Sequence, residues 1–136
     1  MAAHRNEIGG DTWKVPAERM KAGREHVVPL VPAARALLKG QPEAGFLFTG
    51  GRGRLHLSTG AMDALLKRMC LDQFTVHGFR STFKDWVAET TTFASIVSEA
   101  ALAQTIGDKV EAAYRSGALL KKRRQLMAAW AMFCGY

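Results

Sequence analysis

From Ser58 to its end, the chain carries apolar side chains at the three- and four-residue spacing of amphipathic helices. Three stripes of this kind are Met62, Leu65, Leu66 and Met69; Phe79, Phe83, Trp86 and Val87; and Ile96, Val97, Ala100 and Ala101. We expect the first helix to begin at Ser58, a suitable N-cap, and the second to begin near Thr75. The third should end at Gly107. This pattern predicts that the larger part of the chain is a set of packed helices.

Two more helices are predicted closer to the C-terminus. Asp108 with Glu111 three residues later is similar to a capping box, and it predicts a short helix that carries Tyr114. A long amphipathic stripe follows, made of Leu119, Arg123, Leu126, Trp130 and Phe133. We expect this stripe to pack on the domain or on a neighbouring subunit. The basic cluster 121–124 beside it is expected to be a solvated helix face rather than a DNA contact.

The first third of the chain has the pattern of a β-hairpin. The runs 13–15 and 26–28 are short and β-prone. The polar connection 16–25 between them contains Gly23 and would place Lys21 near the turn. We therefore expect two antiparallel strands at the edge of the domain.

The hairpin is followed by smaller predicted elements. Pro32 can occupy the first turn of a short helix that ends at Gly40. The run 46–48 is a candidate for a buried strand, and 50–54 is predicted to be a loop. The predicted fold class is α+β and mainly α, a single domain over residues 1–136 with a small N-terminal β-hairpin edge.

Composition limits the partners and the compartment. Nineteen Lys and Arg against twelve Asp and Glu give a net charge of +7. This excess favours a polyanionic partner, because phosphate contacts release condensed counterions, although an inert basic surface gives the same charge. Cys70 and Cys134 have no CxxC neighbours, so a disulfide framework or zinc site is not expected and the chain suits a reducing cytoplasm. No apolar run is long enough for a membrane span, and residues 1–10 do not have the pattern of a signal peptide.

The quartet His77-Gly78-Phe79-Arg80 is the strongest candidate for chemistry. Residues three apart share a helix face, so imidazole and guanidinium would point together while Phe79 faces the core. A guanidinium matches phosphate oxygens, and histidine can donate to a phosphate oxygen or transfer a proton. The alternative is that His77 and Arg80 are part of a solvated helix surface.

Two other side chains have a structural and a functional interpretation. Lys21 is either a charged hairpin tip or a flexible ammonium that protonates a leaving oxygen. Tyr114 is either a half-buried packing residue or a nucleophile, and as a nucleophile it would need activation because a free phenol has a pKa near ~10. The loop 50–54 is either a connector or a basic loop whose Arg52 and Arg54 reach a DNA backbone. Arg24, close to Lys21 in the hairpin connection, is a further candidate for a DNA contact.

Three segments in order carry a family resemblance. They are TWKVPAERMKAGREHVVPL at 12–30, TVHGFRSTFKDWVAE at 75–89, and EAALAQTIGDKVEAAYRSGALLKKRRQLMAAW at 99–130. Together they resemble the C-terminal catalytic domain of tyrosine recombinases, with the closest likeness to prophage and genomic-island integrases. The resemblance implies a double-stranded DNA partner, no metal and no cofactor.

The resemblance also implies roles. Tyr114 corresponds to the nucleophile that forms a 3′-phosphotyrosyl link and frees a 5′-hydroxyl. Lys21 corresponds to the general-acid lysine, and His77 and Arg80 to the His-x-x-Arg pair. Arg80 would stabilise the charge on the pentacoordinate phosphorus, while His77 would hydrogen-bond the same phosphate or assist proton transfer.

Two departures argue against full activity. The family's first catalytic arginine lies upstream of the hairpin, and the chain starts too late to include it, so we expect an N-terminally truncated domain. The later box usually reads Leu-Ala-His, whereas here it reads Leu102-Ala103-Gln104. Gln104 can donate a hydrogen bond but cannot transfer a proton as imidazolium does. Losing one preorganised donor commonly costs on the order of 10²–10³ in rate.

Three functions remain as hypotheses. The first is a recombinase fragment for DNA integration and recombination, weakly active or inactive alone. The second is a non-catalytic DNA-binding or regulatory module on the same scaffold, favoured by Gln104. The third is an interaction or structural protein whose basic charge is incidental. A partial domain can also expose apolar surface, so we expect a homo-oligomer through the C-terminal helix.

Overall fold

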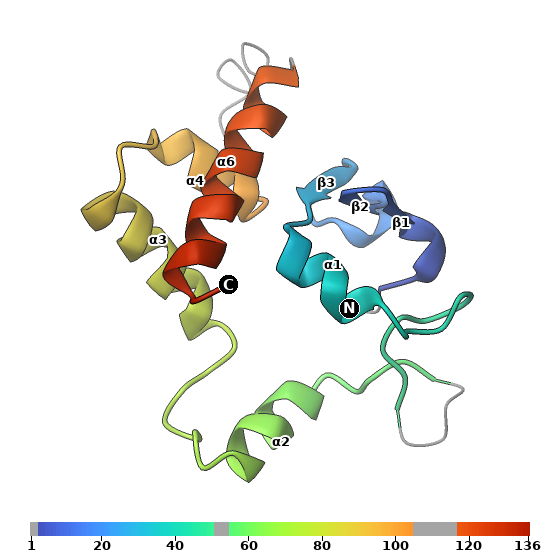
Figure 1. Cartoon of the computed structure of the whole chain (residues 1–136). Helices are drawn as coiled ribbons and strands as arrows, with labels where there is room; N and C mark the ends of the chain where they lie inside the picture. The colour runs from blue at the N-terminus through green and yellow to red at the C-terminus, as the bar shows by residue number, and fades with distance from the viewer. Residues whose placement is uncertain (1–2, 51–54, 105–116) are drawn as a thin grey trace.

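A computed structural model of the chain describes residues 3–50, 55–104 and 117–136. Within them the fold is mainly α, with five α-helices and one three-stranded antiparallel sheet near the N-terminus (Figure 1). The predicted fold class is therefore confirmed. Tyr114, the capping box at 108–111, and Arg52 and Arg54 lie outside the described residues.

The predicted hairpin is present and has one extra strand. Strands β2 (Thr12–Val15) and β3 (His26–Pro29) pair antiparallel with Trp13 opposite Val28. Strand β1 (Ile8–Gly9) pairs with β2 across a two-residue turn in which Gly10 has a φ of +57°. Only glycine adopts this left-handed conformation without steric cost. The sequence pattern did not indicate β1, because two residues are too few to show alternation.

The hairpin connection is fastened to the short 3-10 helix η1 (Arg5–Glu7). The Glu7 carboxylate accepts a hydrogen bond of 2.9 Å from the Trp13 indole and forms an ion pair with Arg19. Arg19 belongs to a second 3-10 helix, η2 (Ala17–Arg19), inside the connection between β2 and β3. The first half of this connection is therefore held against the sheet.

The segment after the sheet only partly follows the prediction. Helix α1 (Pro32–Leu38) has proline at its start and is followed by Gly40 at a φ of +85°, as expected. The predicted strand at 46–48 is wrong, because the chain there forms only isolated bridges, His4 with Phe46 and Thr49 with His56. Leu47 is nonetheless buried, with 1% of its surface exposed.

The helical core agrees with the predicted stripes. Helices α3 (Gly78–Thr90), α4 (Ser95–Ala101) and α6 (Gly117–Phe133) bury Phe83, Val87, Val97 and Leu126. Aromatic rings close this core, with the Trp86 and Trp130 centroids 5.0 Å apart. Figure 1 shows α3, α4 and α6 on one side of the molecule, with the sheet and α1 on the other.

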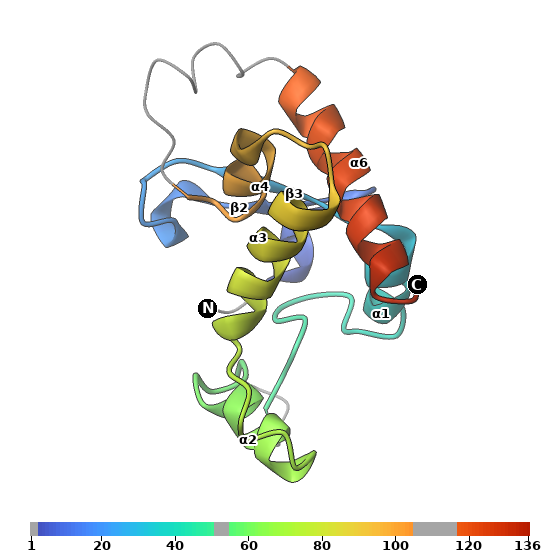
Figure 2. The ribbon, with the colours of Figure 1, turned by 90° about the vertical axis from the view of Figure 1, so that its left-hand side faces the viewer.

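Helix α2 (Ala61–Arg68) lies apart from this core in both views (Figures 1 and 2). Of its predicted stripe only Leu66 is buried, while Met62, Leu65 and Met69 are exposed. The N-cap of α2 is Gly60 rather than the expected Ser58. The Ser58 carbonyl accepts the Ala61 N–H. The periodicity identified an apolar face correctly, but no described element covers that face.

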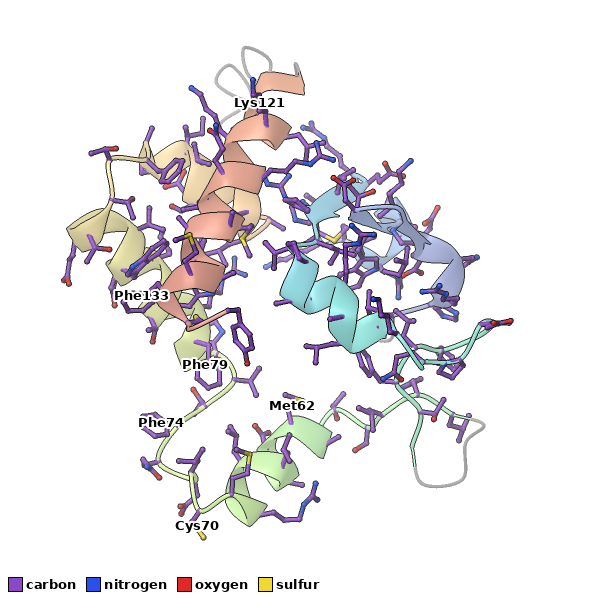
Figure 3. All side chains as sticks on the ribbon, in the orientation of Figure 1. Met62, Cys70, Phe74, Phe79, Lys121 and Phe133 are labelled. Atoms are coloured by element: carbon purple, nitrogen blue, oxygen red, sulfur yellow. The ribbon has the colours of Figure 1, made fainter. Side chains whose placement is uncertain are left out.

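Two predicted helix boundaries and the predicted burial of Phe79 are also wrong. Helix α3 begins at Gly78 rather than near Thr75, although the Thr75 hydroxyl accepts the Gly78 N–H at 3.0 Å as a cap would. Helix α4 ends at Ala101, well before Gly107. Phe79 is 54% exposed instead of buried in the core, and Figure 3 shows it near the end of α3 that lies closer to α2.

Helix α2 ends in a Schellman motif that lacks its usual glycine. The Cys70 N–H donates to Lys67 O and the Leu71 N–H to Leu66 O, while Cys70 has a φ of +56°. Cys70→Gly should relieve this strain and stabilise α2 by about 0.5–1 kcal/mol. Hydrogen exchange of the α2 amides measures the gain, and Cys70→Ala is the matched control that removes the thiol but keeps the strain. Equal protection in both variants would contradict the prediction.

Candidate functional site

A hollow of about 730 Å³ lies between the start of α3, the end of α4 and the second half of α6. Its wall is mostly apolar and includes Phe83, Leu102 and Trp130. His77 and Arg80 are the charged or titratable side chains in this wall. The two residues of the His-x-x-Arg pair therefore line one hollow, His77 from the N-cap of α3 and Arg80 from its first turn.

Arg80 holds the end of α4 against α3. Its Nη2 donates to Leu102 O at 2.6 Å, which is the guanidinium's one hydrogen bond to described residues. The remaining N–H donors of the planar fork are therefore available to a ligand as far as the described residues go. An arginine with one edge fixed and another open is suited to bind a phosphate oxygen at a defined place.

The turn after α4 brings Gln104 back towards α3. Ala103 has a φ of +52°, and the Ala103 and Gln104 N–H groups donate to Ala100 O and Glu99 O. These two bonds form a second Schellman motif, again with a residue other than glycine in the left-handed position. This strained turn places the Leu102 carbonyl against Arg80 and the Gln104 amide against Lys84.

Lys84 is a site residue that the sequence analysis missed. Its Nζ lies 3.2 Å from Oε1 of Gln104. His77, Arg80 and Lys84 are spaced i, i+3 and i+7, and residues at this spacing share one helix face. That spacing was visible in the sequence, and it would have added Lys84 to the His-x-x-Arg pair.

A second polar cluster, formed by Arg123 and His26, holds the end of α4 just before the same turn. Arg123 of α6 is only 7% exposed, donates to Val27 O at 2.6 Å, and lies 3.3 Å from Nε2 of His26. Because a guanidinium has no acceptor, Nε2 of His26 must accept and the ring is neutral. The His26 ring also bonds the backbone of Ala101, the last residue of α4. The cluster thus ties the sheet, α4 and α6 together.

The expectation that residues 121–124 form a solvated face is wrong for Arg123. Burial lowers the pKa of Arg123 to about 10, and its Nε has no partner among the described residues. Arg124 forms a bidentate pair with Asp11, at 3.1 and 3.0 Å, while staying partly exposed. Lys121 is exposed at the far end of α6 (Figure 3).

The remaining predicted residues are placed as follows. Lys21 and Arg24 are exposed in the connection between β2 and β3. Lys21 forms no hydrogen bond or ion pair with the described residues, and it is not among the residues that line the hollow with His77 and Arg80. Cys70 and Cys134 are free and exposed.

Two kinds of feature are absent from the described residues. No group of His, Cys, Asp and Glu there could hold a metal ion. No helix among them has the length and apolarity needed to cross a membrane.

Stability should depend on pH through His26. Burial, followed by the charge of Arg123, lowers the pKa of His26 below 6.5, against the opposing effect of the Ala101 backbone bond. The unfolded chain then binds more protons than the folded one, so the free energy of unfolding should fall as the pH drops below 6.5. Urea titrations across this range measure the slope.

His26→Gln is the matched variant for this measurement, because its amide can replace both hydrogen bonds without titrating. It should flatten the slope. Glu7 does not interfere, because it titrates lower: burial raises the pKa of its carboxyl, but the bonds from Trp13 and Arg19 outweigh burial and lower it from 4.5. An unchanged slope in His26→Gln would show that another group is responsible.

Sequence comparison relates the chain to two proteins of Escherichia coli (strain K12). It is 35% identical to prophage integrase IntA over an alignment of 131 positions that covers 92% of this chain and 32% of IntA. It is 34% identical to prophage integrase IntZ over an alignment of 125 positions that covers 88% of this chain and 31% of IntZ. The chain thus spans about a third of the length of these curated relatives. No family model matches the chain, and no solved structure gives a significant match.

Proposed function

Since this chain is a distant homologue of prophage integrases, we propose that it is part of a recombinase that binds double-stranded DNA and cuts and rejoins it. The observation that carries the proposal is the convergence of His77 and Arg80 at one hollow, with Gln104 on the adjoining turn. The net charge of +7 supports a polyanionic partner.

The donors around the hollow suit a phosphate whose charge increases during reaction. Arg80 is fixed by Leu102 and can direct its remaining N–H groups to a non-bridging oxygen. His77 is exposed at the N-cap of α3 and can donate to the same group. Fixed donors of this kind stabilise the pentacoordinate transition state more than the ground state.

The bond changes of the proposed reaction involve two more residues. The oxygen of Tyr114 attacks the scissile phosphorus and loses its proton to a base, and the bond from phosphorus to the 5′-oxygen breaks. Lys21 gives the 5′-oxygen a proton, and the 3′-phosphotyrosine keeps the bond energy for rejoining. Lys21 lies in an exposed connection, so this role requires the connection to move towards bound DNA.

DNA binding is the first test of the proposal. Fluorescence anisotropy with a short labelled duplex should show binding that weakens steeply with salt, because each neutralised phosphate releases counterions. The slope of log K against log salt counts the phosphate contacts. Absence of salt-dependent binding would contradict the proposed function.

A non-catalytic DNA-binding module is the second candidate, favoured by one observation. Gln104 stands where the family has histidine, and its amide cannot transfer a proton. A nicked suicide duplex separates the two candidates, because a covalent adduct that is lost in Tyr114→Phe shows strand cleavage. Lack of an adduct in Gln104→His, even when an upstream segment that carries the family's first catalytic arginine is joined to the chain, favours the module.

We also propose self-association through α6, because its outer surface leaves Met132 76% and Phe133 61% exposed. Light scattering should show a mass that rises with protein concentration. Met132→Glu should suppress this rise, while Met69→Glu on the separate helix α2 should not. A constant monomer mass would contradict the proposal.

A further inference from the structure

Lys84 joins α3 to the turn that follows α4. Its ammonium group lies 3.2 Å from Oε1 of Gln104, and both side chains are half-buried. Arg80, about 6 Å earlier along the helix axis, holds the carbonyl of Leu102 two residues before Gln104. Two cations on one face of α3 therefore hold both ends of this short turn.

The chemistry of the contact fixes the direction of the Gln104 amide. A lysine ammonium donates hydrogen bonds and accepts none, so it can bond only the oxygen of the amide. The nitrogen of the amide, with its N–H donors, must therefore point away from Lys84. A glutamine without this partner would rotate freely and lose entropy whenever it donated to a ligand.

We propose that Lys84 is a positioning residue, which orients Gln104 so that its amide N–H groups face a DNA phosphate bound beside Arg80. This inference rests on the proposed function, because the phosphate is that of the DNA. His77 and Arg80 then contact the phosphate from the hollow, while Lys84 acts through the amide. Glutamine is a weaker hydrogen-bond donor than imidazolium. The charge-assisted bond from Lys84 to the amide oxygen offsets part of this difference.

The inference predicts that Lys84 and Gln104 are coupled in DNA binding. Lys84→Met should weaken the affinity for a short labelled duplex about three- to tenfold, the usual effect of one hydrogen bond. Gln104→Ala should weaken it by a similar factor, and Lys84→Met added to Gln104→Ala should cause no further loss. The single variant Lys84→Arg can donate to the same oxygen and should keep the affinity of the wild type. Unchanged melting temperatures verify that the variants are folded.

A measurement without DNA separates this inference from the proposed function. Nitrogen-15 relaxation of the Gln104 side-chain amide should show an ordered group in the wild type and in Lys84→Arg, and a mobile one in Lys84→Met. A mobile amide in the wild type overturns the inference, as does undiminished binding by Lys84→Met.

Two further outcomes are decisive. Additive losses, with a salt slope that is lower by about one in Lys84→Met, would show that Lys84 contacts a phosphate directly and would overturn its positioning role. A wild-type chain that binds no duplex would overturn the proposed function, while the relaxation data would still decide whether Lys84 orients the amide.

Discussion

Arg123→Ala should lower the free energy of unfolding by about 2–4 kcal/mol. Arg123 is 7% exposed, and its removal leaves the Val27 carbonyl and Nε2 of His26 without the donor they share. A buried acceptor without a partner loses its solvation without compensation, and the shortened side chain also leaves a cavity. Urea denaturation, with the transition followed by circular dichroism, measures the loss.

The neighbouring Arg124 provides a matched control. It has the same charge and lies on the same helix, but its bidentate pair with Asp11 is largely in solvent. Arg124→Ala should therefore change the stability much less than Arg123→Ala. Arg123→Met separates packing from hydrogen bonding, because it fills the space without donating. Full stability in Arg123→Met would contradict a stabilising role for the bonds to Val27 and His26.

The helices of the core could be predicted because their apolar faces meet one another. The stripes around Phe83, Val97 and Leu126 each contribute to one cluster, so the period of the sequence corresponds to real burial. The same period in α2 and at Phe79 predicted burial that the structure does not show. A repeating pattern identifies an apolar face, but it does not reveal whether another element covers that face.

Arg123 illustrates two sequence signals in conflict. Its position in the stripe predicted an inward side chain, while the charge of the cluster 121–124 predicted a solvated face. The inward position prevailed because β3 presents the carbonyl of Val27 and the ring of His26 at that point of α6. Such partners lie almost a hundred residues away in sequence, so a local pattern cannot reveal them.

His77 and Arg80 could be predicted to lie together for a similar reason. His77 and Arg80 belong to one helix start, so their spacing alone brought them to the same hollow. The pairing of Lys84 with Gln104 needed the turn at Ala103, whose left-handed backbone is usually occupied by glycine. Nothing in Leu-Ala-Gln indicates that turn, so the helical spacing of Lys84 from His77 and Arg80 was the one available signal, and it says nothing of the contact with Gln104.

The second large effect concerns Arg80 and DNA affinity. Arg80→Ala should weaken binding to a duplex about 10- to 100-fold, the range expected for one charge-assisted contact to a phosphate. Arg80→Lys should recover only part of this loss, because an ammonium keeps the charge but lacks the planar fork that can hold Leu102 O and a phosphate together. Anisotropy titrations at several salt concentrations measure both variants.

Arg68→Ala is the comparison for Arg80→Ala, since Arg68 is an exposed arginine at the end of α2, away from the hollow. It removes the same charge, so long-range attraction to DNA falls equally in both variants. Only Arg80→Ala also removes the donors at the hollow and the anchor of the turn that carries Gln104. Equal losses of affinity in the two variants would mean that only net charge matters and that the hollow beside α3 is not where a phosphate binds.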